Sequence, residues 1–146
     1  MNNYDKITDK LYIGNMWSLN DIIRDKPPIT HIISFISVQP HIKDILKANN
    51  ITYYEYLFDD SYKEKIIDRY NDIKDIIQDY LINQNGVVMV LCHAGRSRSA
   101  SIAILILMNY YDVSFESALK YINARRMVQL NRQFHNDLQM YSQSLK

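Results

Sequence analysis

The segment VVMVLCHAGRSRSASIAIL, from Val87 to Leu105, decides the fold of this chain. Its first five residues are apolar and predict a buried strand, and the apolar run after Ser99 predicts a helix. The loop between them, CHAGRSRS, contains Cys92, the single cysteine of the chain, with two arginines and one histidine. This order predicts a strand, a tight polar loop and a helix in direct succession.

Strand-like and helix-like patterns alternate on both sides of this segment. The predicted strands are residues 11–14 (a short edge strand), 31–36, 51–58 and 87–91. The predicted helices are residues 17–23, 41–48, 66–80, 99–110, 114–126 and 131–142. Such alternation indicates an α/β fold with a mainly parallel central sheet, in a single domain spanning residues 1–146. Ligands bind such sheets at the carboxyl ends of the strands, where the cysteine loop is expected.

The loop has the composition of an anion-binding site. A loop that enters the first turn of a helix directs several backbone N–H groups at one point, and the helix dipole adds positive potential there. The small residues of the loop allow the backbone to curl around an anion, and Arg98 offers a planar fork for two phosphoryl oxygens. The residues expected to surround the phosphate are His93, Ala94, Gly95, Arg96 and Ser97.

Cys92 is the candidate nucleophile, because a helix N-terminus and a neighbouring arginine favour the thiolate form of a cysteine. The alternative is an ordinary buried cysteine. The presence of glycine three residues later, Arg98 six later and Ser99 seven later favours phosphoryl transfer to Cys92.

Hydrolysis of a phosphate ester also needs a proton donor for the leaving oxygen. The sequence LFDDS follows a predicted strand, so its carboxylates should stand near the same edge of the sheet. We expect Asp60 to be the general acid, with Asp59 as the reserve. The alternative is that both residues merely cap the next helix.

Composition excludes several other classes of protein. Lys and Arg total 17 against 16 Asp and Glu, which argues against a dedicated nucleic-acid binder. One cysteine excludes an internal disulfide, and the histidine spacing does not suggest a metal site. The first residues lack the apolar segment of a signal peptide, and the longest apolar run, residues 102–108, is too short to span a bilayer. A cytoplasmic protein without a membrane anchor is expected.

CHAGRSRS matches the C-x5-R-[ST] loop of the cysteine-based protein tyrosine phosphatases, and the chain most resembles their dual-specificity group. Further segments resemble that group in the same order: ITDKLYIGN, THIISFI, FDDS, the helices of residues 99–126, and NRQFHNDL. The resemblance implies a protein tyrosine phosphatase-like fold with about five strands. It also implies a phosphatase acting on phosphotyrosine, phosphoserine and phosphothreonine in proteins, without metal or cofactor. Oligomeric state is left open, with a monomer favoured.

The resemblance implies a role for each site residue. Cys92 would form a phosphocysteine, Arg98 would bind the phosphoryl oxygens, Asp60 would act as acid and then as base, and Ser99 would stabilise the departing thiolate. Asn131 would brace the loop.

Two residues depart from the family pattern and leave alternatives open. Leu91 stands where most members have a histidine, which leaves open a weakly active phosphate-binding pseudophosphatase. Arg96, beside His93, is either a solvated side chain or a contact for a multiply charged substrate. The latter leaves open a phospholipid or another non-protein phosphate as substrate.

Overall fold

A computed structural model describes residues 2–145 of the protein. The elements along the chain are β1 (Tyr4–Thr8), β2 (Leu11–Gly14), α1 (Ser18–Asp25), β3 (His31–Ser34), α2 (Pro40–Ala48), β4 (Thr52–Glu55), α3 (Ile66–Gln78), the π-helical turn η1 (Asp79–Asn83), β5 (Val88–Leu91), α4 (Arg98–Tyr111), α5 (Phe115–Asn123) and α6 (Arg132–Ser144). Each predicted helix and strand is therefore present, with bounds that differ by a few residues.

The strands form one five-stranded sheet in the order β1-β2-β5-β3-β4. Strands β2, β5, β3 and β4 are parallel and β1 is antiparallel to β2, which confirms the predicted mainly parallel sheet. The prediction that residues 11–14 form an edge strand is wrong, because β1 pairs with the outer side of β2. The sequence of β1, YDKIT, escaped prediction because only Ile7 of its residues is buried and the strand has no apolar alternation.

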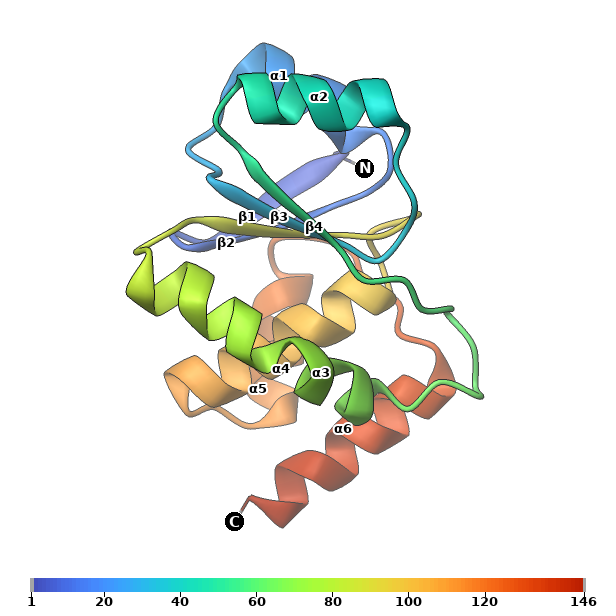
Figure 1. The fold of residues 1–146 in the computed structure, drawn as a ribbon. Helices are drawn as coiled ribbons and strands as arrows, with labels where there is room; N and C mark the ends of the chain where they lie inside the picture. Colours follow the sequence, from blue (N-terminus) through green and yellow to red (C-terminus); the bar gives the residue numbers. More distant parts are fainter. Residues whose placement is uncertain (1, 146) are drawn as a thin grey trace.

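Helices cover both faces of the sheet (Figure 1). Helices α1 and α2 lie on one face, and α3, α4, α5 and α6 lie on the other. Alternation along β5 divides its side chains between two cores, because successive residues of a strand point to opposite faces. Val88 and Val90 belong to the large core with α3–α6, and Met89 and Leu91 belong to the smaller core with α1 and α2.

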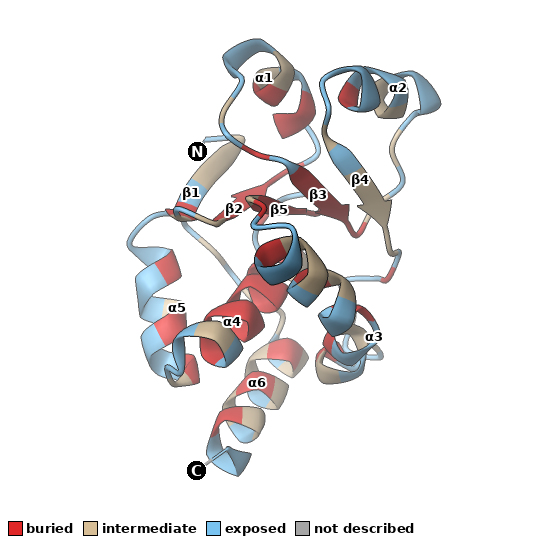
Figure 2. Ribbon diagram, turned by 60° about the vertical axis from the view of Figure 1, so that its left-hand side comes forward, coloured by how far each residue is buried: buried red, intermediate tan, exposed pale blue. Residues whose placement is uncertain are grey.

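Helix α4 lies at the centre of the large core. All its residues from Ser99 to Met108 are buried, and Figure 2 shows α4 almost entirely in the buried colour while α5 and α6 bury one side. A helix that is apolar on every side must be enclosed by other elements. This enclosure holds the beginning of α4 rigidly against the end of β5.

The register of the sheet brings the predicted site residues to one edge. Gly14, Leu91 and Ser34 lie side by side at the carboxyl ends of β2, β5 and β3, and Glu55 is paired with Ser34 at the end of β4. The predicted strand 51–58 is shorter than expected because β3 ends at Ser34, to which Tyr56 donates its backbone N–H (2.8 Å). The chain then leaves the sheet, so residues 56–65 connect β4 to α3 beside the loop that follows β5.

Replacing Leu91 by alanine should lower the free energy of unfolding by about 2–5 kcal/mol, because its fully buried side chain fills the core under α1 and α2. Urea denaturation measures the change. The matched control is Leu57→Ala, since Leu57 is exposed and its truncation leaves no cavity. Equal stability losses in the two variants would contradict this account of Leu91.

Candidate active site

The loop of residues 92–97 joins β5 to α4 at the carboxyl edge of the sheet. Cys92 directly follows β5, and its backbone N–H donates to the carbonyl of Gly14 (3.3 Å), which continues the ladder between β5 and β2. The Cys92 side chain is 2% exposed. The sheet therefore fixes the position of the sulfur before the loop begins.

The carbonyl oxygens of all four residues between Cys92 and Ser97 accept hydrogen bonds from outside the loop. The donors are Met16 N for His93 (3.0 Å), Arg126 Nη2 for Ala94 (3.4 Å), Arg126 Nε for Gly95 (2.8 Å) and Gln129 N for Arg96 (3.0 Å). The carbonyls of this loop consequently face away from its interior.

Outward carbonyls turn the amide N–H groups inward. In a trans peptide the N–H of one residue points opposite to the carbonyl of the residue before it, and no peptide bond among residues 2–145 is cis. The N–H groups of Ala94, Gly95, Arg96 and Ser97 are thus directed toward the inside of the loop. The Gly95 N–H confirms this direction, because it donates to Cys92 Sγ (3.3 Å).

The beginning of α4 contributes further donors. Within the described part of the chain, no side chain caps the N-terminus of α4 at Ser97. The first N–H groups of a helix have no partner within the helix and carry a partial positive charge. The loop and this helix end together form a site for a tetrahedral oxyanion.

Gly95 is required by the shape of the loop. Its φ of +67° is in the left-handed region, and a Cβ at this position would lie 2.5 Å from Arg126 Nη2 and 2.9 Å from the carbonyl oxygen of Gly14. Only glycine combines this backbone conformation with so close an approach.

The Cys92 sulfur has two hydrogen-bonding neighbours. Besides the Gly95 N–H, the hydroxyl of Ser99 lies 3.1 Å from Sγ. Ser99 is completely buried in the first turn of α4. The sulfur therefore lies within hydrogen-bonding distance of one backbone N–H and one buried hydroxyl.

Asp60 is tied to the loop and to α6. Its Oδ1 accepts from Ser97 Oγ (2.7 Å) and from Asn131 Nδ2 (2.7 Å). The Ser97 hydroxyl in turn accepts from the backbone N–H of Asn131 (3.0 Å). Both bonds to the carboxylate go to one oxygen, which leaves Oδ2 as the oxygen that can carry a transferable proton.

Arg98 reaches the same connection between β4 and α3. Its Nη1 donates to the carbonyl of Phe58 (2.9 Å). The ring of Phe58 packs against Phe35 (centroids 5.0 Å apart) and against Phe134 of α6 (6.5 Å). Aromatic packing therefore anchors the segment two residues before Asp60.

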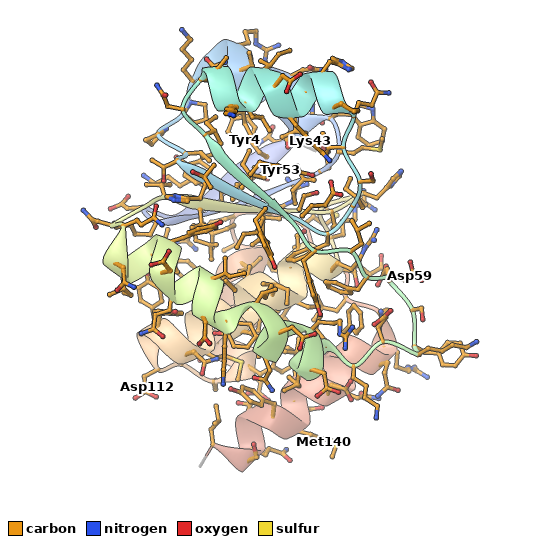
Figure 3. The ribbon with its side chains drawn as sticks, in the orientation of Figure 1. Tyr4, Lys43, Tyr53, Asp59, Asp112 and Met140 are labelled. Atoms are coloured by element: carbon orange, nitrogen blue, oxygen red, sulfur yellow. The ribbon has the colours of Figure 1, made fainter. Side chains whose placement is uncertain are left out.

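Tyr56 adds to this anchor, with its ring centroid 6.0 Å from that of Phe58. Burial is the main cause, and the hydrogen bond to Asp72 the second, of the raised pKa of Tyr56, which is about 12. Tyr56 does not line the cavity over the loop, so its contribution is to the packing of this segment. Asp59, the reserve candidate, is exposed on the outer side of the same connection (Figure 3).

A cavity of about 430 Å³ lies over the loop. The residues that line it are Asp60, Cys92, His93, Ala94, Arg96, Ser97, Arg98, Gln129, Leu130 and Asn131. Most of the predicted site residues thus lie together. Gly95 and Ser99 are outside the lining and act on the sulfur from beneath it.

The rim of this cavity is basic. His93 and Arg96 are exposed, and His93 stacks edge-on against Trp17 (5.8 Å). None of the ion pairs among residues 2–145 involves Arg96. The exposed guanidinium of Arg96 therefore places a positive charge at the rim of the cavity.

Arg126 and Gln129 are loop contacts that were not predicted. Arg126 could have been found, because it continues the buried positions Ala118 and Ile122 at intervals of four residues. The partner of Arg126, Asp5, lies 121 residues away, and no local pattern marks it.

The described residues 2–145 contain no group of three His, Cys, Asp or Glu side chains arranged to hold a metal ion. None of the helices in this range is long and apolar enough to cross a membrane.

Known proteins resemble the chain along most of its length. The family model "Dual specificity phosphatase, catalytic domain" matches residues 11–144. A probable dual specificity protein phosphatase of Dictyostelium discoideum is 32% identical, over 100% of this chain and 36% of the relative. Dual specificity protein phosphatase MPK-4 of Drosophila melanogaster is 31% identical, over 94% of this chain and 35% of the relative. The chain thus spans about a third of the length of these two relatives.

Solved structures agree with the fold. The structure of DUSP15 has a TM-score of 0.79 at 28% identity, covering 97% of this chain and 88% of that one. The human tyrosine phosphatase-like serine/threonine/tyrosine-interacting protein has a TM-score of 0.77 at 26% identity, covering 97% of both chains. Human DUSP28 has a TM-score of 0.80 at 18% identity, covering 99% of this chain and 96% of that one. The predicted protein tyrosine phosphatase-like α/β fold is confirmed.

Gly95→Ala should distort the loop and weaken oxyanion binding, because the added Cβ collides with Arg126 and the φ of +67° is strained for alanine. We expect a loss of about 1–3 kcal/mol in the free energy of unfolding. Urea denaturation and calorimetric titration with tungstate, a tetrahedral oxyanion, measure the two effects. A variant with the stability and tungstate affinity of the wild type would contradict the role assigned to Gly95.

Proposed function

The chain belongs to the dual specificity phosphatase family, and from this premise we propose that it is a cysteine-dependent phosphatase of phosphotyrosine, phosphoserine and phosphothreonine in proteins. One observation carries the proposal. The Cys92 sulfur lies at the floor of a loop with inward N–H groups, with Arg98 and Asp60 beside the same cavity. We also propose that residues 1–146 are one catalytic domain, acting in the cytoplasm as a monomer without metal or cofactor.

In the first step the Cys92 thiolate attacks phosphorus. The sulfur–phosphorus bond forms while the bond to the ester oxygen breaks, and Asp60 Oδ2 gives its proton to that oxygen. The inward N–H groups and Arg98 hold the other phosphoryl oxygens, whose charge must be neutralised as the bonds exchange. The bond from Arg98 to the Phe58 carbonyl uses Nη1, which leaves Nε and Nη2 as donors for these oxygens.

In the second step water hydrolyses the phosphocysteine. Asp60, now ionised, takes a proton from the attacking water, and the sulfur departs as a thiolate. The hydroxyl of Ser99, 3.1 Å from Sγ, supports the proposal that this residue stabilises the departing sulfur. The products are inorganic phosphate and the regenerated enzyme.

A phosphate on a lipid or another non-protein molecule is the second candidate substrate. The exposed Arg96 on the rim of the cavity favours it. Its guanidinium forms no ion pair with the described residues 2–145, and a positive charge beside the reactive phosphate attracts a multiply charged ligand.

A weakly active phosphate-binding protein is the remaining alternative. Leu91 is fully buried in the core under α1 and α2, so no histidine supports the loop from this position. A relative of 26% identity is named a tyrosine phosphatase-like interacting protein, which is consistent with this alternative. The two groups that do lie within hydrogen-bonding distance of Sγ, the Gly95 N–H and the Ser99 hydroxyl, favour an active enzyme.

Cys92→Ser should abolish turnover and retain phosphate binding, because the serine hydroxyl is a far weaker nucleophile in an unchanged oxyanion site. The measurement is phosphate release by the wild type and the variant from phosphotyrosine and phosphothreonine peptides and from phosphoinositides. We expect the wild type to hydrolyse the peptides. Hydrolysis of the lipids alone would support the second candidate, and a wild type that binds phosphate without turnover would support the binding protein.

Asp60→Ala should slow alkyl phosphate esters about 10²–10⁴-fold, because their leaving oxygens need a proton. Esters with acidic leaving groups, such as p-nitrophenyl phosphate, should be slowed much less. The matched control is Asp59→Ala, whose exposed carboxylate lies outside the cavity lining. Equal slowing of both kinds of ester, or a larger effect at Asp59, would reject Asp60 as the acid.

A further inference from the structure

Arg126 is a buried arginine to which the proposed reaction assigns no task. It follows α5, and its side chain is 0% exposed. The guanidinium donates on one side to the loop, to Gly95 O (2.8 Å) and Ala94 O (3.4 Å). On the other side Nη1 donates to Asp5 Oδ2 (2.8 Å) and Asn2 O (2.8 Å). The arginine therefore connects the anion-binding loop to the N-terminal strand.

These contacts determine how two peptide planes of the loop are turned. The plane between Ala94 and Gly95 has its carbonyl on Arg126 and its N–H on Cys92 Sγ. The plane between Gly95 and Arg96 has its carbonyl on Arg126 Nε, so its N–H is directed away from Arg126. Without these donors, the Gly95–Arg96 plane would lose the bond to its carbonyl, and the Ala94–Gly95 plane would be held only by the bond of its N–H to Cys92 Sγ.

Arg126 differs from the other groups that bind the loop carbonyls. The donors to His93 and Arg96 are backbone amides of Met16 and Gln129, whose directions follow from the path of the chain. Among the described groups that donate to the carbonyls of residues 93–96, Arg126 alone donates through its side chain. Its rigid planar guanidinium bonds two consecutive carbonyls. A lysine donates from one nitrogen only, so it cannot reproduce the two nitrogens, Nε and Nη2, from which Arg126 reaches the two carbonyls.

Asp5 makes the burial of this charge tolerable. Its side chain is 13% exposed and stands on β1, the edge strand. A buried guanidinium without a counter-charge is strongly destabilising, whereas a well-bonded pair is not. Asp5 thus holds the Arg126 guanidinium in its orientation at the outer side of the loop.

We propose that Arg126, held by Asp5, is a positioning residue that turns the N–H groups of Gly95 and Arg96 toward the bound phosphoryl group and the Cys92 sulfur. The inference rests on the proposed function, since it assigns a task within the same site. It adds β1 and the end of α5 to the machinery that prepares the loop for an oxyanion.

The test compares Arg126→Lys with Arg125→Lys, in the full chain. Arg125 is the neighbouring residue, exposed, and donates to the Tyr121 carbonyl (2.9 Å) without touching the loop. Calorimetry on the folded protein measures the tungstate affinity. The rate of alkylation of Cys92 by iodoacetate is measured at one pH, and urea denaturation measures the stability. We expect Arg126→Lys to bind tungstate about tenfold or more weakly, with slower alkylation and a lower kcat, and Arg125→Lys to match the wild type.

A second variant, Asp5→Asn, covers the case in which Arg126→Lys does not fold. The amide keeps an acceptor for Arg126 but removes the counter-charge, and we expect tungstate affinity between those of the wild type and Arg126→Lys. A purely structural role predicts instead that both variants unfold at lower urea while their folded forms bind tungstate and react with iodoacetate like the wild type. That result overturns the inference alone. A wild type that binds no tungstate overturns the proposed function together with it.

Discussion

The orientation of four carbonyl groups is the constraint on which the candidate active site depends. Each carbonyl from His93 to Arg96 is bound from outside the loop, and trans geometry then directs the following N–H groups inward. A short loop left to itself has no reason to align four consecutive peptide planes against a common anion, because parallel dipoles repel. The surrounding structure supplies the opposing contacts, from the segment after β2, the end of α5 and the segment before α6.

The rest of the fold holds these contacts in place. The parallel register of β2, β5 and β3 brings Gly14, Leu91 and Ser34 together at one edge, so the loops that follow must be neighbours. Burial of α4 on all sides prevents its first turn from moving with respect to β5. The acid-bearing segment is held by the packing of Phe58 in the aromatic cluster and by the two bonds to Asp60 Oδ1, one from Ser97 of the loop and one from Asn131. Nucleophile and acid thus come from two segments that are bonded directly to each other, through Ser97 and Arg98.

The local signals that predicted most of the fold were strong because they come from burial. Residues that pack into the two cores form the apolar runs of β3 and β5 and the spacing of three and four residues in α3. These patterns can be recognised in the sequence without a structure. Prediction failed where burial left no pattern. Strand β1 is largely polar, and its absence from the prediction made β2 an edge strand. The predicted strand at 51–58 continued too far because the end of a strand depends on where its partner ends.

The sequence by itself determined the chemical inventory and its order: a cysteine at the end of a buried strand, a tight loop with arginine, a serine in the first helical turn, and an aspartate after the preceding strand. Those features are local, because each depends on neighbours within a few residues. The sequence also preferred Asp60 to Asp59 as the acid, but only the tertiary structure shows the contacts of Asp60 with Ser97 and Asn131. The tertiary structure also brought Asp5 to Arg126 across 121 residues. A hydrogen bond between distant segments depends on how the whole chain packs. The residue pattern within either segment therefore does not predict it.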